Sequence, residues 1–308
     1  MKISVAMTTF NGKDYLVQQL DSIRIQTVAP QEVVIVDDCS TDGTIELISE
    51  YIKNYQLEHW KLIVNRENVG WRKNFRKALS FTSGEIVFLA DQDDIWNKTK
   101  VEETVLQFLN EKNAEVIVTN YDVLYDGRKE RVRIKNINKD DRTLKRIKFT
   151  YRTIYVLRPG CTFAIKRSIL DMMRQFDDPI HAHDCIIWNL AIIRNSLYIF
   201  NRKLIYFRRH INSASTPVSG LSRERRASEI RLAEDLSHFL IKVEKHVNVN
   251  SNYFYSHKLQ RIVNFLKKRR EIILDGNILQ LLMFQFKSFY FYPTLRNLLS
   301  DILVFLMP

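Results

Sequence analysis

Short apolar runs alternate with helix-patterned segments through the first 120 residues of the chain. Compact apolar runs predict strands at residues 3–7, 33–36, 62–64, 86–89 and 116–119. Between them, apolar residues recur every three or four positions, which predicts helices at 15–23, 45–55, 71–82 and 97–110. This alternation favours an α/β fold with a largely parallel sheet and helices on both of its faces.

Two of these helices have candidate caps. Ser40 or Thr41 is expected to cap the helix over 45–55, and Asn97 the helix that ends at Asn110.

The pattern changes beyond residue 120. Residues 121–150 are rich in charge and are interpreted as a loop or hairpin insertion, and residues 150–210 mix strands with one helix. From residue 222 the apolar positions follow helical spacing, with no low-complexity linker before them. We therefore predict a domain at residues 1–215 and a helical C-terminal region at 216–308.

Polar clusters follow three of the predicted strands. They are Thr8–Asn11, Asp37–Asp42 and Asp91–Asp94. In parallel α/β sheets, ligands bind beyond the carboxyl ends of the strands. We expect the three clusters to meet at one edge of the sheet and to form the functional site there.

The formal net charge of +12 is unevenly distributed. Residues 1–100 hold 12 Lys and Arg against 14 Asp and Glu, so the remainder carries a net charge of +14. A basic second part suits a polyanion, an anionic membrane surface or a phosphate-bearing substrate, and does not choose among them.

The cysteines and the apolar runs bear on the compartment. Cys39, Cys161 and Cys185 are odd in number and form no CxxC pair, so they indicate neither a zinc site nor a disulfide framework. The first residues lack a signal-peptide pattern, and no stretch is long and apolar enough for a spanning helix. We expect a cytoplasmic protein, with attachment to the inner face of the cell membrane as the alternative.

The strongest chemical signal is Asp91-Gln92-Asp93-Asp94, directly after a buried strand. Three carboxylates this close repel one another, and burial strengthens the repulsion. A divalent cation such as Mg²⁺ or Mn²⁺ relieves it and can bridge a carboxylate to substrate phosphates. The alternative is a solvated acidic turn before a helix.

Two weaker signals lie elsewhere on the same predicted edge. Asp37 and Asp38 can accept hydrogen bonds from a nucleobase or a ribose, although helix capping explains them equally well. Asn68-Val69-Gly70 precedes a helix and could present backbone N–H groups to a phosphate, with an ordinary turn as the alternative.

Four segments together resemble the family 2 glycosyltransferases, which have the GT-A fold. They are VAMTTFNGKDYLVQQLDSI, VVIVDDCSTDGT, NVGWRKNFRKAL and GEIVFLADQDDIW, and all lie within residues 1–100. The resemblance implies a nucleotide-sugar donor and Mn²⁺ or Mg²⁺ as cofactor. It implies nucleotide contacts at Thr8, Phe10, Asn11, Asp37, Asp38, Lys73 and Asn74, beside the turn Asn68–Gly70 already named.

The resemblance also assigns chemistry. Asp91-Gln92-Asp93 is similar to the DXD motif, with Asp93 as direct metal ligand and Asp91 assisting through ribose or metal. Asp184 resembles the catalytic base, which must take the proton of the acceptor hydroxyl. It follows His183 where many relatives carry Glu. A helix cap is the alternative role for Asp184.

Two further segments complete the expected site. Gly160 and Cys161 belong to a segment similar to the one that approaches the donor sugar, and glycine permits a close backbone approach. After the predicted base, Arg208 could neutralise phosphate charge and His210 could complete the metal site. A solvated basic strand end is the alternative reading of both.

The donor sugar follows from a narrower likeness. DQDDIW, GCTFAIKR, the His-Asp pair and RRHINSAS resemble bacterial rhamnosyltransferases, which implies dTDP-rhamnose, with UDP- or dTDP-linked hexoses as alternatives. The acceptor would be a glycan or a lipid-linked saccharide in bacterial surface polysaccharide synthesis. No QxxRW-like segment follows Asp184, which favours non-processive addition of one sugar.

Two other protein classes compete with this interpretation. A nucleotidyltransferase would show a glycine-rich basic loop soon after the first strand, where this chain has Thr8-Thr9-Phe10-Asn11. A nucleic-acid-binding protein would leave the acidic edge unexplained, because carboxylates repel phosphate. We therefore expect no nucleic-acid partner.

The C-terminal tail combines the basic run 267–270 with the aromatic-rich segment 284–292. Such a tail suits packing on the core, a homodimer surface or peripheral contact with an anionic membrane. Packing is the interpretation we favour from the sequence.

Overall fold

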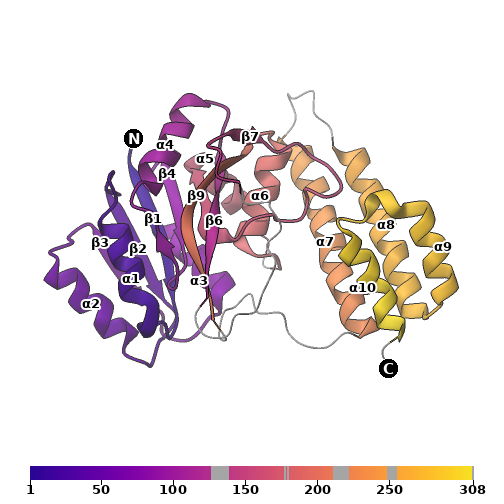
Figure 1. Cartoon of the computed structure of the whole chain (residues 1–308), viewed down its shortest axis with the longest axis horizontal. Coiled ribbons are helices and arrows are strands. Elements are labelled where there is room, and N and C mark those ends of the chain that lie inside the picture. Colours follow the sequence, from indigo (N-terminus) through magenta and orange to yellow (C-terminus); the bar gives the residue numbers. More distant parts are fainter. Residues whose placement is uncertain (126–138, 177, 179, 211–221, 248–254, 307–308) are drawn as a thin grey trace.

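The computed structural model describes residues 1–125, 139–176, 178, 180–210, 222–247 and 255–306. Its centre is one mixed sheet of nine strands within these residues (Figure 1). In spatial order the strands are β3 (Trp60–Val64), β2 (Glu32–Asp37), β1 (Ile3–Thr9), β4 (Ile86–Ala90), β8 (Phe163–Lys166), β6 (Val116–Tyr125), β9 (Leu197–Arg209) and β5 (Ile95–Trp96), with β7 (Leu144–Arg146) also pairing with β9.

The first four strands of that order are parallel, as the βαβ pattern predicts. β1 pairs in parallel with both β2 and β4, and β2 with β3. The strand β8 then enters antiparallel between β4 and β6, and β6 and β9 are parallel to each other. The sheet is therefore mixed, and the three polar clusters named from the sequence follow strands of its parallel part.

Helices cover both faces of the sheet. On one face lie α1 (Lys13–Arg24), α2 (Thr44–Asn54) and α4 (Lys100–Asn110), whose Leu16, Ile48 and Val101 share a core with alternate residues of β1. On the other lie α3 (Trp71–Phe81), α5 (Arg167–Gln175) and α6 (His183–Ile193). Successive side chains of a strand point to opposite faces, so one strand feeds both cores.

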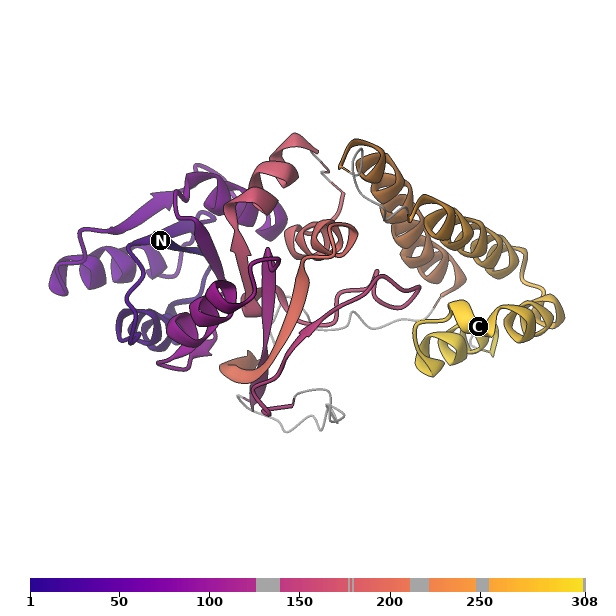
Figure 2. The same ribbon diagram turned by 90° about the horizontal axis from the view of Figure 1, so that it is seen from above.

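Four helices form a bundle beside the sheet. They are α7 (Arg223–Val247), α8 (Ser256–Asp275), α9 (Ile278–Ser288) and α10 (Leu295–Leu306), with short 3₁₀ turns η1 (Gly160–Thr162) and η2 (Phe289–Phe291) elsewhere in the described chain. Figure 1 and Figure 2 both show α6 between the sheet and the bundle. Its residues 186–193 are all buried, because the sheet and the bundle share one apolar core around it.

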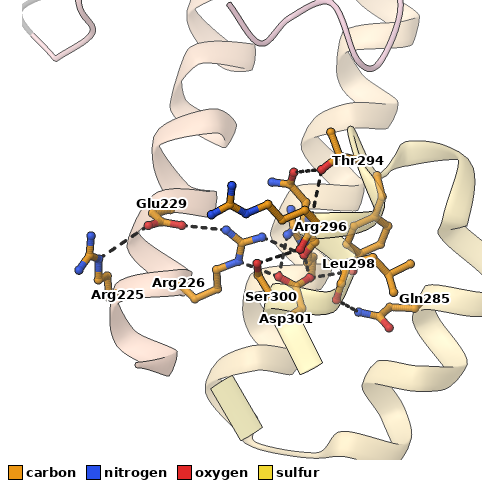
Figure 3. A network of polar contacts seen from close by, with 12 residues as sticks. Arg225, Arg226, Glu229, Gln285, Thr294, Arg296, Leu298, Ser300 and Asp301 are labelled. Atoms are coloured by element: carbon orange, nitrogen blue, oxygen red, sulfur yellow. Dashed lines mark hydrogen bonds and ion pairs between the residues drawn. The ribbon is translucent and has the colours of Figure 1, made fainter. Parts of the chain in front are cut away.

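A buried carboxylate fastens the bundle. Asp301 of α10 is fully buried and accepts hydrogen bonds from Arg226 of α7 at 2.7 Å and from Arg269 of α8 at 2.6 and 2.7 Å. The Tyr292 hydroxyl donates to it at 2.9 Å. Figure 3 shows the guanidinium of Arg226 between the carboxylates of Asp301 and Glu229, donating a hydrogen bond to each. Three helices thus meet at one charge.

Several sequence predictions need correction at element ends. The sequence predicted one helix within residues 150–210, and the structure has two, α5 and α6. The additional helix α5 has nine residues, too few for its helical spacing to stand out in the sequence. The strand predicted at 116–119 runs on to Tyr125 as β6. Part of the predicted insertion, residues 126–138, lies outside the described residues.

Neither predicted cap lies at its helix. Gly43, in the left-handed region at φ 91°, precedes α2, and Thr44 N–H is bound by the side chain of Asp42 at 3.0 Å. Asn97 accepts from Thr99 N–H at 3.1 Å, and α4 begins only at Lys100. The side chains of Asp42 and Asn97 therefore form turns that precede α2 and α4 and do not cap these helices.

Helices α7–α10 fill the described part of the predicted C-terminal region, and the division at residue 215 stays a prediction. Within the described residues, none of the helices combines the length and the hydropathy that crossing a bilayer requires.

Replacing Asp301 by Asn is expected to lower the free energy of unfolding by about 3–5 kcal/mol, because two arginines lose their buried counter-charge. Urea unfolding followed by circular dichroism measures it. The matched control is Asp235→Asn, whose carboxylate is 41% exposed and 4.0 Å from Arg231. That change should be about 0.5 kcal/mol or less. Equal effects of the two variants would show that the buried pairing does not stabilise the bundle.

Candidate active site

The turns after β1, β2 and β4 meet at one edge of the sheet. The register pairs Thr9 of β1 with Asp37 of β2, and Met7 of β1 with Ala90 of β4. The residues that follow each strand therefore lie next to one another. This confirms that the three polar clusters share an edge.

Asp37 ties the first two turns together. Its carboxylate is fully buried and accepts from the hydroxyls of Thr9 at 2.6 Å and Ser40 at 2.7 Å, and from Ser40 N–H at 2.7 Å. Asn11, at φ 45°, accepts from Thr41 N–H at 2.9 Å. Asp37 and Asn11 thus shape the edge through contacts within the protein.

Asp38 organises the segment before α3. One carboxylate oxygen accepts from Asn65 Nδ2 at 2.8 Å and Val69 N–H at 2.9 Å, and the other from Gly70 N–H at 2.9 Å. Asn74 is buried and donates to the carbonyl of Val36 at 2.9 Å. Backbone N–H groups of 69–70 therefore point at Asp38 instead of being held open for a phosphate.

Other members of the predicted nucleotide site are accessible at the same edge. Phe10 is 44% exposed. Lys73 and Asn68 are exposed as well, and Asn68 accepts from Gly70 N–H at 3.0 Å. Thr8 is buried at the end of β1.

Gln92 clamps the first turn to the acidic one. Its side-chain oxygen accepts from Phe10 N–H at 2.8 Å and its nitrogen donates to Phe10 carbonyl at 3.0 Å. A Cβ on Gly12 would lie 2.2 Å from the same amide, so a side chain at this position would displace Gln92 from the turn. The middle residue of Asp91-Gln92-Asp93 therefore positions the turn that carries Phe10.

The carboxylates of Asp91 and Asp94 lie together beneath this turn. An oxygen of each, and Cys161 Sγ, lie within 4.8 Å of one another. Burial and the charges of Asp94, Asp93 and Asp184 raise the pKa of Asp91 well above its usual range. Burial and Asp93 raise the pKa of Asp94 to about 7.

This arrangement fits a divalent cation. Asp94 Oδ2 is buried with no hydrogen-bond partner among the described residues. Burial also raises the pKa of Cys161, which keeps it a neutral thiol. Mg²⁺ and Mn²⁺ prefer carboxylate oxygens to thiols, so the aspartates are the fitting ligands and Cys161 lines the site.

A buried lysine lies behind the acidic turn. Lys100 is fully buried, and its Nζ lies 4.6 Å from the Trp96 ring centroid and 5.3 Å from that of Phe88. Burial lowers the pKa of Lys100 to about 7, and the charges of Cys161 and Asp94 oppose this. A lysine at a helix start carries no sequence signal of burial, so sequence reasoning missed it.

Arg208 and His210 reach the acidic turn from the end of β9. Arg208 N–H donates to Asp94 Oδ1 at 3.0 Å, and its guanidinium donates to the Asp93 carbonyl at 2.8 Å. His210 Nε2 lies 2.9 Å from Asp93 Oδ2, and its ring stacks on Tyr15 at 4.7 Å. The structure thus brings Asp93 and His210 together across 117 residues.

Asp184 comes to the site from the first turn of α6. A Cβ on Gly160 would lie 3.3 Å from Asp184 Cβ and 3.5 Å from Oδ2, so these two segments touch. The charge of Asp184 also acts on Asp91. Asp184 Oδ1 accepts from Cys185 N–H at 2.8 Å. The carboxylate of Asp184, on α6, therefore lies near the acidic turn that follows β4.

His183 is a residue that sequence reasoning noted but did not place in the site. It is buried, stacks on Phe75 at 4.0 Å, and lies 3.3 Å from the position of a Cβ on Gly160. Neither ring nitrogen has a hydrogen-bond partner among the described residues. Its place beside Asp184 was the only signal available.

Comparison with known proteins adds the decisive observation. The family model for glycosyl transferase family 2 matches residues 4–173, which is more than half of the chain. This chain belongs to glycosyl transferase family 2. The matched residues hold all three polar turns and Gly160, and they end before Asp184.

Bacterial glycosyltransferases are among the relatives of this family 2 chain. The dTDP-rhamnosyl transferase RfbG of Shigella flexneri is 30% identical over 224 residues, covering 67% of this chain and 72% of RfbG. The poly(ribitol-phosphate) beta-N-acetylglucosaminyltransferase TarS of Staphylococcus aureus is 33% identical over 120 residues, covering 38% of this chain and 20% of TarS. The chain thus spans a fifth to nearly three quarters of these relatives.

Solved structures share the fold. TarS 1-349 of S. aureus in complex with UDP-GlcNAc has a TM-score of 0.63 at 21% identity, covering 99% of this chain and 79% of that one. The mannosyltransferase PcManGT of Pyrobaculum calidifontis, in complex with GDP-Man and Mn²⁺, has a TM-score of 0.55 at 15% identity, covering 99% and 87%. The family 2 chain therefore has the GT-A fold.

Stability should fall with acid through His183. Burial lowers its folded pKa to about 4, against about 6.5 when unfolded. The unfolded state therefore binds the proton first, and stability present above pH 6.5 is lost as pH falls toward 4. The loss reaches roughly 3 kcal/mol.

Urea unfolding at pH values from about 7.5 to about 4.5, a range that spans most of the interval between the two pKa values, measures this loss in wild type and in His183→Gln. Glutamine cannot take the charge, so the variant should lose less stability on acidification. The exposed His257→Gln is the control and should follow wild type. Parallel curves for wild type and His183→Gln would contradict the burial of a neutral imidazole.

Proposed function

We propose that this chain is an inverting, metal-dependent, non-processive glycosyltransferase that moves one sugar from a nucleotide-sugar donor to an acceptor hydroxyl. The observation that carries the proposal is the approach of Asp184 to the Asp91–Asp94 cluster, at the edge where the turns after β1, β2 and β4 meet. A base and a metal-binding cluster then face one reaction centre.

The donor nucleotide lies on the N-terminal half of the site in this proposal. Phe10 and Lys73 supply accessible contacts, while Asp37, Asp38 and Asn74 hold the turns in shape. Asp38 retains a lone pair on Oδ2 that can accept from the base or the ribose. The Thr8–Asn11 turn, clamped by Gln92, closes the other side.

Asp91 and Asp93 would hold Mn²⁺ or Mg²⁺, with His210 beside Asp93 at the end of β9. Asp94 would complete the set, because its carboxylate lies with that of Asp91 and its Oδ2 has no hydrogen-bond partner among the described residues. When bound, the cation stabilises the negative charge that develops on the leaving diphosphate. The sharing of negative charge among Asp91, Asp93 and Asp94 supports this assignment, since a cation removes their repulsion. Arg208 keeps the turn in place through the Asp93 carbonyl.

Asp184 is the proposed base. Its carboxylate takes the proton from the acceptor hydroxyl while the oxygen forms a bond to the anomeric carbon. The bond from that carbon to the diphosphate oxygen breaks in the same step, so the configuration inverts. Gly160 leaves room beside Asp184 for the reacting groups, because any side chain there would press on Asp184 and His183.

L-Rhamnose from dTDP-rhamnose is the first candidate donor. The match to RfbG, which extends over 67% of this chain, supports it. TarS binds UDP-GlcNAc in its crystal structure, so a UDP- or dTDP-linked hexose is the alternative. The proposed acceptor is a glycan or lipid-linked saccharide of bacterial surface polysaccharide synthesis.

A nucleotidyltransferase is disfavoured, because the turn after β1 is occupied by Phe10 and Gln92 instead of a glycine-rich basic loop. The acidic edge likewise disfavours a nucleic-acid partner.

A donor screen tests the reaction and the sugar. Purified protein with Mn²⁺ is incubated with dTDP-rhamnose, UDP-glucose, UDP-galactose and UDP-GlcNAc, and release of the nucleoside diphosphate is followed with and without chelator. We expect dTDP release from dTDP-rhamnose that chelator abolishes. Release from a UDP-sugar alone would discard rhamnose and keep the class. Absence of metal-dependent binding to every donor, measured by calorimetry, would contradict the proposal.

Asp184→Asn is expected to lower turnover by about 10²–10⁴-fold and to leave donor affinity unchanged, because it removes the base and keeps the shape. Turnover and donor Kd are measured on the same preparation. The control is Asp171→Asn on α5, whose carboxylate is 58% exposed. Near-normal turnover of Asp184→Asn would assign the base elsewhere.

A further inference from the structure

Helix α9 carries a row of exposed apolar side chains. Leu279, Leu282, Met283 and Phe286 follow spacing i, i+3, i+4 and i+7, and are 72, 45, 64 and 89% exposed. This spacing places them on one face of the helix. Phe289 and Tyr290 of η2 continue the row at 55 and 68% exposure. We call these six residues the α9 face.

The opposite side of α9 is packed. Leu281 and Gln285 are buried against the bundle, and Phe284 stacks on Phe265 of α8 at 5.4 Å. The amphipathic pattern is therefore satisfied on one side only. Contiguous apolar surface of this kind marks an interaction site on a water-exposed protein.

The charge around the α9 face is positive. Between Gly276 and Pro308 the sequence has one acidic residue, Asp301, which is buried in its ion pairs. Lys287 and Arg296 are the basic residues of the same stretch, and both are exposed. The described part of this stretch therefore offers cations beside apolar groups, and the exposed carboxylate that precedes α9 in the sequence is Asp275, at the end of α8.

The α9 face does not include the basic run 267–270 that the sequence analysis named. Lys268 pairs with Glu271 at 3.7 Å, Arg269 with Asp301 at 2.6 Å and Arg270 with Glu234 at 3.1 Å. Arg269 and Arg270 thus join helices of the bundle, whereas Lys268 pairs on the surface within α8. Of the aromatic segment, Tyr292 is buried, and Phe284 and Phe291 pack on the core.

We propose that the α9 face lies on the surface of an anionic lipid bilayer, with Phe286 in the headgroup and acyl boundary and Lys287 and Arg296 toward lipid phosphates. Interfacial helices combine an apolar face, flanking cations and aromatic residues in this way. Figures 1 and 2 show α9 at the outer end of the bundle, away from the sheet, so the site stays open to solvent.

A second copy of the chain fits the α9 face less well. Next to the exposed cations Lys287 and Arg296 the sequence has one exposed carboxylate, Asp275, so a twofold contact would leave positive charge in excess between the copies. The helix is also short, since its 11 residues span about 16 Å. One face of such a helix supplies only part of the roughly 800 Å² per partner that a stable dimer interface buries.

This inference is independent of the donor sugar, since lipid binding needs no substrate. The full chain is sedimented with vesicles of phosphatidylcholine alone and of equal parts phosphatidylcholine and phosphatidylglycerol. We expect binding to the anionic vesicles that weakens with added salt, and weaker binding to the neutral ones.

The variant replaces Leu279, Met283 and Phe286 by Ser, all exposed positions. We expect its affinity for anionic vesicles to fall by roughly tenfold or more, since each apolar side chain contributes on insertion. The control replaces Leu106 and Leu109 of α4 by Ser as well. These two side chains are 50 and 51% exposed, and the control should bind like wild type. Thermal melts confirm that both variants fold.

Equal vesicle binding of wild type and the α9 variant, or no binding of wild type at low salt, would overturn the proposal. Sedimentation velocity without lipid supplies the other arm. A dimer that the α9 variant loses would assign the face to a second copy and overturn the lipid assignment. Loss of donor turnover with intact vesicle binding would concern the proposed reaction alone.

Discussion

Mutual repulsion among Asp91, Asp93, Asp94 and Asp184 is the constraint on which this structure depends. The sheet register brings the first three to one edge, and α6 brings the fourth from the other half of the molecule. The raised pKa values of Asp91 and Asp94 show charge that the protein compensates only in part. Arg208 and His210 steady the turn from β9, so that the last strand of the sheet is needed to shape the first half.

The same edge shows a division between contact and support. Asp37, Asp38 and Asn74 each follow or face a strand end, as nucleotide-binding residues do, yet most of their hydrogen-bonding capacity is used within the protein. They fix the shape of three loops, and Phe10 and Lys73 supply the accessible surface. Such loops bind without first having to order themselves.

The parallel half of the fold and its polar edge were predictable from the sequence, because local period and strand-end chemistry determine both. The antiparallel pairing of β8 with β4 and β6 was not predictable, because a four-residue apolar strand gives no indication of its direction in the sheet. Lys100 and His183 escaped for a related reason: their burial comes from Trp96, Phe88 and Phe75, which lie elsewhere in the chain. The exposed row on α9 required knowledge of which aromatic residues the bundle uses.

The position of α6 has a consequence for how the two halves of the site are encoded. The family match ends at residue 173, while Asp184 starts a helix held between sheet and bundle by contacts such as Trp188 Nε1 to the carbonyl of Thr153 at 2.7 Å. The part of the chain that the family model covers therefore lacks Asp184, the proposed base. Under the proposed mechanism, changes in the bundle re-aim that carboxylate without altering any residue at the edge where the turns after β1, β2 and β4 meet, so acceptor choice would have its own stretch of sequence to vary.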